Sequence, residues 1–148
     1  MKGSYLLGLR VERPLTLSYG TKRGRLKAGP YLYLGSALRG LGPRLLRHAQ
    51  RLGGPPHPAF HALKRAFPEA RARKGALHWH VDYLLENAHV QLVAVWVFPG
   101  LDEAALYPQV LGWGGRPVLP GFGASDHPEH ESHLFALAHD HVPHPPIG

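Results

Sequence analysis

The segment Tyr31–Gln50 (YLYLGSALRGLGPRLLRHAQ) constrains the fold more than any other, because its hydrophobic period changes along its length. Residues 31–37 alternate aromatic and aliphatic side chains and end in Gly-Ser-Ala, which predicts a strand that ends in a turn. From Pro43 to about Leu52 the pattern is helical, and proline suits the first turn of a helix because its missing N–H has no partner there. A strand that turns directly into a helix indicates a chain of mixed α and β structure.

Further strands are expected on both sides of this segment. Hydrophobic patterning predicts strands over residues 3–11 and 14–20, and a dense run of valines predicts the strongest strand, over residues 88–100. Between them, residues 21–27 (TKRGRLK) are expected to form a basic turn, and the Gly-, Pro- and His-rich chain from Gly114 onwards is expected to be irregular.

A short helix is expected over residues 102–112, since Asp102 can cap its start and Gly112 can end it. The order of these elements predicts an α/β (α+β) fold, with a small, partly antiparallel central sheet flanked by helices. The length fits one domain, which we expect over residues 1–135, followed by a His- and Pro-rich tail over residues 136–148.

Charge is distributed very unevenly along the chain. Of the 17 lysines and arginines, all but Arg116 lie in residues 1–75, whereas that half holds only Glu12 and Glu69 of the 10 acidic residues. A half so basic predicts a polyanionic partner, most simply nucleic acid; the alternative is a basic, solvated surface without a specific partner.

Composition excludes several classes of protein. With no cysteine, the chain has no disulfide, no thiolate zinc site and no cysteine nucleophile. No apolar run reaches the length of about 20 residues that a membrane span needs, and the first residues lack the pattern of a signal peptide. We therefore expect a cytoplasmic protein without membrane contact, and the excess of arginine over lysine fits a thermophilic or GC-rich source.

Five side chains of chemical interest fall on the expected strands and helices. Tyr5 lies in Gly-Ser-Tyr on the first strand and Tyr33 in Tyr-Leu-Gly on a later one. Arg44 and His48 lie four residues apart on the following helix and so share a face, and Glu103 begins the last helix. This combination resembles the GIY-YIG nuclease superfamily.

Two later motifs extend the resemblance to residues 3–135. HWHVDYLL and PGFGASD…SHLF are similar to an uncharacterised prokaryotic branch of that superfamily. The chain also departs from the pattern: residues 6–32 make an unusually long connection between the two tyrosines, and Ser4 and Leu34 replace isoleucines. After Ser125-Asp126, where the branch carries cysteines, this chain has HPEHESH.

The resemblance implies a role for each member of the set. Glu103 would bind one Mg²⁺ or Mn²⁺ ion, which prefers oxygen ligands and keeps several waters. Arg44 would hold the scissile phosphate with its planar guanidinium, and Tyr5 would act as general base or orient the attacking water. Tyr33 would contact the phosphate or assist Tyr5, and His48 would orient a tyrosine or transfer a proton.

Backbone positions would share in substrate binding. The pair Gly35-Ser36 would let the backbone approach the phosphate closely. In the glycine-rich loop GFGASD, Ser125 and Asp126 could touch substrate; the alternative is a glycine turn with an Asx cap.

Each of these residues also has a purely structural interpretation. Tyr5 and Tyr33 could be ordinary strand aromatics, Arg44 and His48 ordinary helix residues, and Glu103 a residue that favours a helix start because of its charge.

Two groups of histidines suggest a second metal. His127, His130 and His133 recur at three-residue spacing, and their imidazoles could hold Zn²⁺, although the surrounding Pro and acidic residues also suit an exposed loop. In HWHVD, the residues His78, His80 and Asp82 would face the same way if the segment were a strand.

The sequence therefore predicts a metal-dependent endonuclease that hydrolyses a phosphodiester in DNA, or less favourably RNA, by a GIY-YIG-type one-metal mechanism. Two alternatives remain open at this point. One is a non-catalytic nucleic-acid-binding module of the same fold, and the other is a zinc-binding protein built on the histidine-rich end.

Overall fold

In a computed structural model of the chain, residues 3–19, 21–37, 84–85, 87–124 and 129–138 are described. The helix expected from Pro43 to Leu52 lies outside these residues, as does most of HWHVDYLL, of which only Leu84 and Leu85 are described, in helical conformation.

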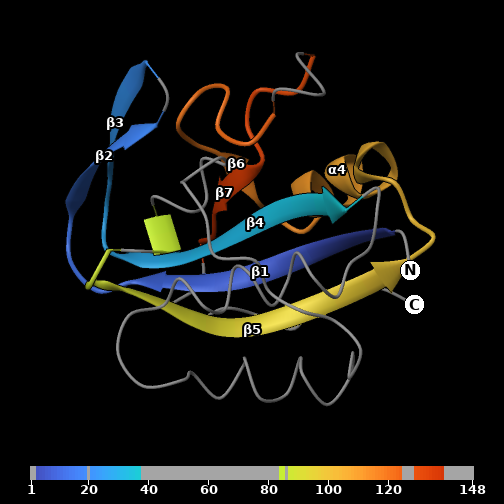
Figure 1. Cartoon of the computed structure of the whole chain (residues 1–148), viewed down its shortest axis with the longest axis horizontal. Helices are drawn as coiled ribbons and strands as arrows, with labels where there is room; N and C mark the ends of the chain where they lie inside the picture. The colour runs from blue at the N-terminus through green and yellow to red at the C-terminus, as the bar shows by residue number, and fades with distance from the viewer. Residues whose placement is uncertain (1–2, 20, 38–83, 86, 125–128, 139–148) are drawn as a thin grey trace.

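A five-stranded sheet forms the body of the described structure (Figure 1). Its strands lie in the spatial order β5-β1-β4-β7-β6, and every pairing among them is antiparallel. They comprise β1 (Gly3–Val11), β4 (Gly29–Ala37), β5 (Val90–Pro99), β6 (Arg116–Pro117) and β7 (Leu134–Ala136). Together with the helix over residues 103–112, this sheet confirms the mixed α and β fold class expected from the sequence.

The pairing of β1 with β4 fixes the register at the centre of this sheet. The two strands pair over their whole length, from Gly3 opposite Ala37 to Val11 opposite Gly29. Residues 12–28 therefore leave and rejoin the sheet at neighbouring positions, and the long connection between the tyrosines does not separate the two strands.

That connection is itself a β-hairpin, made of β2 (Leu15–Tyr19) and β3 (Lys22–Leu26). The expectation of a basic turn over residues 21–27 was wrong for β3. Arg23 and Arg25 stand on its solvent face, while Leu26 points inward and is buried. The charge of the outer face therefore hides the strand pattern in the sequence.

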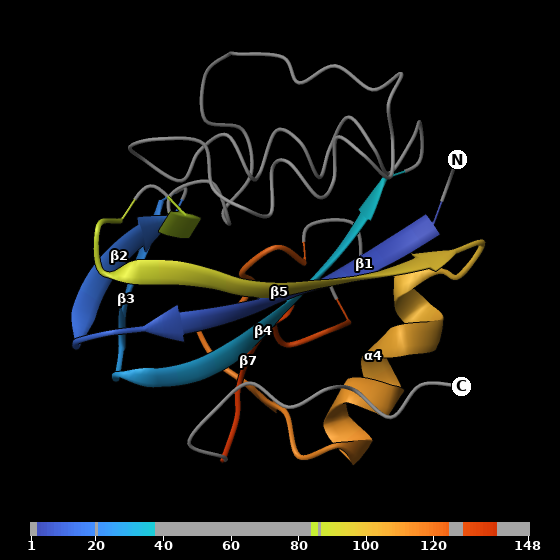
Figure 2. The same ribbon diagram turned by 90° about the horizontal axis from the view of Figure 1, so that it is seen from below.

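Alternate residues along the strands belong to two separate apolar clusters, one on each face of the sheet. On one face, Tyr5, Leu7 and Leu9 of β1 pack with the inner face of the hairpin and with Phe122. On the other, Leu6 packs with the single described helix of more than one turn, α4 (Glu103–Gly112), which lies along one side of the strands in Figure 2.

Helix α4 has nearly the bounds that its sequence predicts. Asp102 caps it by accepting a hydrogen bond from the N–H of Ala104 at 2.7 Å, and its last residue is Gly112. Strand β5 likewise occupies most of the valine-rich run. The chain after Gly114 is less irregular than expected, because β6 and β7 add to the sheet; strands of two and three residues are too short to show a period in the sequence.

Among the described residues, no helix is long and apolar enough to cross a membrane.

Candidate active site at the tyrosine motifs

The two motif tyrosines lie on neighbouring strands and point to the same face of the sheet. Tyr5 is opposite Gly35 in the register of β1 and β4, and Tyr33 is opposite Leu7, one pleat further along. Their ring centroids are 6.4 Å apart with an interplanar angle of 52°. Both side chains are buried, with exposed fractions of 0% for Tyr5 and 2% for Tyr33.

Gly35 is required by this arrangement because the ring of Tyr5 lies across it. A Cβ atom at position 35 would stand 2.7 Å from Cε2 of Tyr5, and closer still to its Cζ and hydroxyl oxygen. The glycine of the Tyr-Leu-Gly motif thus leaves the space that the tyrosine of the Gly-Ser-Tyr motif occupies.

Ser4, which precedes Tyr5 in the first motif, connects β1 to the start of α4. It is fully buried, and its hydroxyl donates a hydrogen bond to the carbonyl of Leu101 at 2.6 Å. Glu103 follows two residues later, so this bond ties the strand of Tyr5 to the helix end that carries Glu103.

The glycine-rich loop singled out in the sequence packs against Tyr33. Phe122 meets the Tyr33 ring edge-on, with centroids 6.1 Å apart, and Gly123 adopts a φ of 67° beside it. A Cβ at Gly123 would stand 3.2 Å from the hydroxyl oxygen of Tyr33. Two backbone hydrogen bonds stabilise the turn of this loop. The N–H of Phe122 donates to the carbonyl of Leu119 (2.9 Å), and the N–H of Ala124 donates to the carbonyl of Gly121 (3.2 Å).

A row of four aromatic rings leads from the hairpin to the site formed by Tyr5, Tyr33 and Gly35, which we call the tyrosine corner. Tyr19 of β2 contacts Phe122 at 5.3 Å between centroids, Phe122 contacts Tyr33, and Tyr33 contacts Tyr5. The hydroxyl of Tyr19 donates to the carbonyl of Pro120 at 3.2 Å, and burial raises the pKa of Tyr19 above its ordinary value. The sequence had singled out neither Tyr19 nor Phe122, since contacts between distant single aromatics leave no local pattern.

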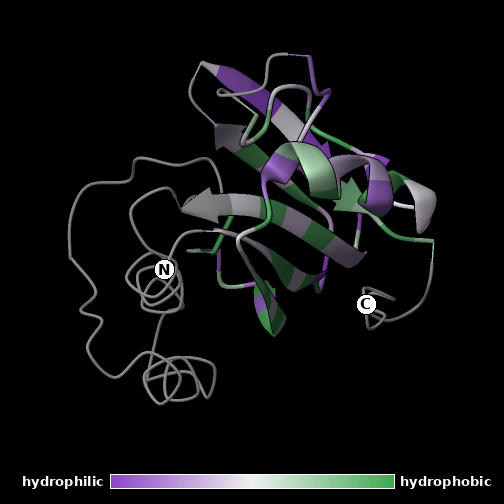
Figure 3. Cartoon of the chain, turned by 90° about the vertical axis from the view of Figure 1, so that its right-hand side faces the viewer, coloured by the Kyte–Doolittle hydropathy of each residue, from purple (hydrophilic) through white to green (hydrophobic). Residues whose placement is uncertain are grey.

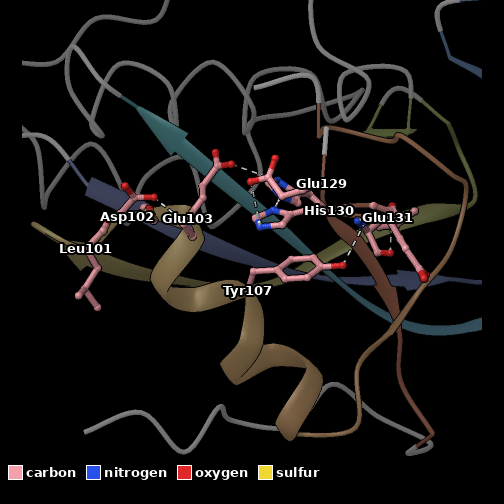
Figure 4. Close-up of polar contacts among 12 residues, drawn as sticks. Leu101, Asp102, Glu103, Tyr107, Glu129, His130 and Glu131 are labelled. Atoms are coloured by element: carbon pink, nitrogen blue, oxygen red, sulfur yellow. Dashed lines mark hydrogen bonds and ion pairs between the residues drawn. The ribbon is translucent and has the colours of Figure 1, made fainter. Parts of the chain in front are cut away.

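On the other face of the sheet, Glu103 begins a chain of polar side chains (Figure 4). Its carboxylate Oε2 lies 3.1 Å from Nδ1 of His133, and both side chains are nearly inaccessible, with exposed fractions of 9% and 0%. This distance is within the range of an ion pair between a carboxylate and an imidazolium. On the far side of the ring, Nε2 of His133 lies 2.7 Å from Nδ1 of His130.

Tyr107 holds the outer end of this chain. Its ring stacks on that of His130, with centroids 3.8 Å apart and an interplanar angle of 2°. Its hydroxyl accepts a hydrogen bond from the backbone N–H of Glu131 at 3.2 Å, as Figure 4 shows. Because Tyr107 and Glu103 lie four residues apart on α4, one face of the helix holds both ends of this row of polar side chains.

The backbone of His133 connects this row of polar side chains to the tyrosine corner. Its carbonyl accepts from the N–H of Leu34 at 2.9 Å, between the tyrosine and the glycine of the motif, and its N–H donates to the carbonyl of Phe122 at 2.8 Å. The motifs GFG and SHLF, far apart from YLG in the sequence, thus lie directly against it.

The side-chain atoms of Glu103, His133 and His130 that could bind a metal follow one another in a row, and they do not converge on a common point. Two nitrogens that bind one tetrahedral Zn²⁺ at 2.0–2.1 Å are roughly 3.3 Å apart, whereas the two imidazole nitrogens of His130 and His133 are at hydrogen-bond distance. Among the described residues, no three His, Asp or Glu side chains form a metal-binding group. A zinc site with His127, which lies outside them, stays a prediction.

A single Mg²⁺ or Mn²⁺ ion makes a smaller demand, because it can be held by one carboxylate and several waters. Glu103 supplies an oxygen donor of the required kind, and His133 beside it would orient that carboxylate, as outer partners of metal ligands do. The metal role of Glu103 also stays a prediction.

The structure thus places Tyr5, Tyr33 and Gly35 together on one face of the sheet, and Glu103, His130 and His133 together at α4. The remaining predicted site residues lie outside the described part of the chain, or their side chains do: these are Arg44, His48, Ser125, Asp126, His127 and the side chain of Ser36, and also His78, His80 and Asp82.

Comparison with known families places the chain in one of them. The family model described as domain of unknown function DUF123 matches residues 4–145, so the chain belongs to this family. The match includes both tyrosine motifs, α4 and the histidine segment. Neither the curated proteins nor the solved structures gave a match.

Proposed function

We propose that this protein is a metal-dependent endonuclease of the GIY-YIG type, which hydrolyses a phosphodiester bond in DNA and acts in the cytoplasm. The observation that carries the proposal is the register of β1 and β4, which sets Tyr5 opposite Gly35 and Tyr33 beside them. The unusually long connection between the motifs is one departure from the superfamily pattern, and the hairpin β2–β3 accommodates it without disturbing this pairing.

Each side chain has a task in this reaction. The phenol of Tyr5 accepts the proton of the attacking water or orients that water, and Tyr33 stands beside it to contact the phosphate. Arg44, assigned from the sequence, neutralises the charge that grows on the phosphate oxygens. A divalent cation at Glu103 would supply Lewis acidity, and His133 would keep the carboxylate oriented. Because Glu103 belongs to the α4 side of the sheet, the proposal also requires that the phosphate binds at the end of β1, where Ser4 bonds to Leu101 and the start of α4 comes next to the strand of Tyr5.

The burial of the tyrosines favours one competing function. Because Tyr5 and Tyr33 are almost inaccessible, both rings also serve as core residues of the face that they share with Phe122. A nucleic-acid-binding module without catalysis needs only that packing role. The endonuclease requires in addition that substrate binding uncovers the phenol of Tyr5.

The deciding experiment is a cleavage assay with Mg²⁺ or Mn²⁺ on labelled duplex, branched and single-stranded DNA and on RNA. Wild type is compared with Tyr5→Phe, Glu103→Gln and Arg44→Ala, and each variant is also tested for DNA binding. We expect each substitution to lower the cleavage rate by about 100-fold or more, the usual contribution of a general base or charge-stabilising group, while binding persists.

Tyr31→Phe is the matched control. Tyr31 lies on the same strand and in the same cluster as Tyr33 but outside the motif, and its hydroxyl donates to the carbonyl of Lys27 at 2.7 Å. This variant should cut at the wild-type rate. Equal cutting by all variants would reject the proposed site, and salt-sensitive binding without any cleavage would favour the binding module.

A further inference from the structure

The hairpin β2–β3 has a solvent face made of paired hydroxyl and guanidinium groups. In its register Thr16 is opposite Arg25 and Ser18 is opposite Arg23, and all four residues are exposed. Side chains two residues apart on a strand share a face and stand roughly 6–7 Å from one another. The outer face therefore presents two arginines in a row, each beside a hydroxyl group.

This charge is not neutralised by the protein. In the part of the chain that the structure describes, neither Arg23 nor Arg25 takes part in an ion pair or a side-chain hydrogen bond. The hairpin contains no acidic residue, and Lys22 and Lys27 add exposed positive charge at its ends. Figure 3 shows β3 as a largely hydrophilic strand near the top of the view.

The inner face fixes the hairpin relative to the tyrosine corner. Leu15, Leu17 and Tyr19 are buried in the cluster that includes Tyr5 and Tyr33. At the tip, Lys22 Nζ and Tyr19 OH both donate to the carbonyl of Pro120, at 3.3 and 3.2 Å, beside Phe122. Through the row of rings, the Tyr19 ring lies at most about 18 Å from that of Tyr5, which is about five base-pair steps of duplex DNA at 3.4 Å each.

From these observations we infer that the outer face of the hairpin binds the phosphate backbone of duplex DNA and places the duplex near the tyrosine corner. This inference rests on the proposed function for the identity of the corner. Arginine and hydroxyl side chains are the groups that commonly contact phosphates, and such contacts position the protein without specifying sequence. Single-strand binders add exposed aromatic rings on which bases stack, whereas the hairpin's one aromatic side chain, Tyr19, is buried.

Equilibrium binding to a 20-base-pair DNA duplex tests the inference. It is measured in EDTA, so that nothing is cut, over a series of salt concentrations. Each phosphate contact contributes about 0.9 to the slope of log K against log salt concentration. The double variant Arg23→Ala/Arg25→Ala should therefore reduce that slope by about 2, whereas Arg23→Lys/Arg25→Lys should keep most of it.

Arg116→Ala is the control for loss of one positive charge. Arg116 is also exposed, but it lies on β6 at the edge of the five-stranded sheet. It should leave the slope unchanged, whereas Arg25→Ala alone should lower it by about 1. Thermal denaturation of all variants should match wild type, because the substituted side chains are exposed and Arg23 and Arg25 have no partner to lose.

The possible results separate this inference from the proposed function. A slope unchanged in the double variant, an equal effect of Arg116→Ala, or a larger loss on single-stranded DNA or duplex RNA than on duplex DNA would overturn the hairpin inference, even if the protein cuts DNA. A slope that falls as expected supports it, even if no substrate is ever cut. Absence of any DNA binding by wild type would overturn both.

Discussion

At the scale of single residues, the contact between Gly35 and Tyr5 decides how the two tyrosine motifs pack. The Tyr5 ring occupies the space above Gly35, and Tyr5 is fully buried, so a side chain added at position 35 would compete with the ring for that space. The spacing of residues within each motif is thus a packing requirement of paired strands, whatever chemistry the phenol performs.

Gly35→Ala should therefore destabilise the protein. An added methyl group in a filled core usually costs about 1–3 kcal/mol of unfolding free energy. Urea denaturation would measure the change. Gly112→Ala is the control, since no atom lies within 4 Å of its Cβ position, and it should be neutral or stabilise by up to about 1 kcal/mol. Equal stability of the two variants would show that the Tyr5 ring does not lie across Gly35.

Single residues also mark the limit of what sequence predicts about the site. The resemblance to GIY-YIG motifs singled out Tyr5, Tyr33 and Glu103, because local patterns place the two tyrosines on strands and Glu103 at a helix start. It could not indicate that Tyr107 stacks on His130, since their contact depends on how a helix and a distant loop meet. Lone aromatic residues at such contacts carry no local signal.

At the scale of elements, strong local signals were sufficient for the long strands and for α4. The valine run became β5, and Asp102 and Gly112 delimit the helix, because period and capping are properties of neighbouring residues. Prediction failed for β3, whose charged outer face imitates a turn, and for β6 and β7, which exist only because a paired strand is available.

The cap of α4 offers a prediction at this scale. Asp102 accepts a hydrogen bond from the N–H of Ala104 and places a negative charge at the positive end of the helix. Asp102→Ala should lower the unfolding free energy by about 1 kcal/mol, and Asp102→Asn, which keeps the acceptor, by much less. Urea denaturation of the two variants side by side measures the difference; equal losses would mean that the side-chain cap contributes nothing.

At the scale of the whole molecule, one sheet separates two apolar clusters that have no buried residue in common. Strand β1 supplies both, with Leu6 on the α4 face and its two neighbours, Tyr5 and Leu7, on the hairpin face. Loss of order on one face should therefore disturb the strand that supports the other, and the two faces should unfold together.

A core substitution on the hairpin face tests this coupling with a probe on the opposite face. Trp96 and Trp113 pack against the α4-side cluster, and Trp79→Phe would leave them as the only tryptophans. In that background, Leu17→Ala removes a buried side chain of the hairpin and should cost about 2–5 kcal/mol. We expect tryptophan fluorescence and far-ultraviolet circular dichroism to shift to the same lower urea midpoint, because a two-state domain reports one transition to every probe. If the fluorescence midpoint stayed at its value in the Trp79→Phe background while circular dichroism lost part of its amplitude early, the hairpin face would unfold independently, and the path of rings from β2 to Tyr5 would not be a rigid connection.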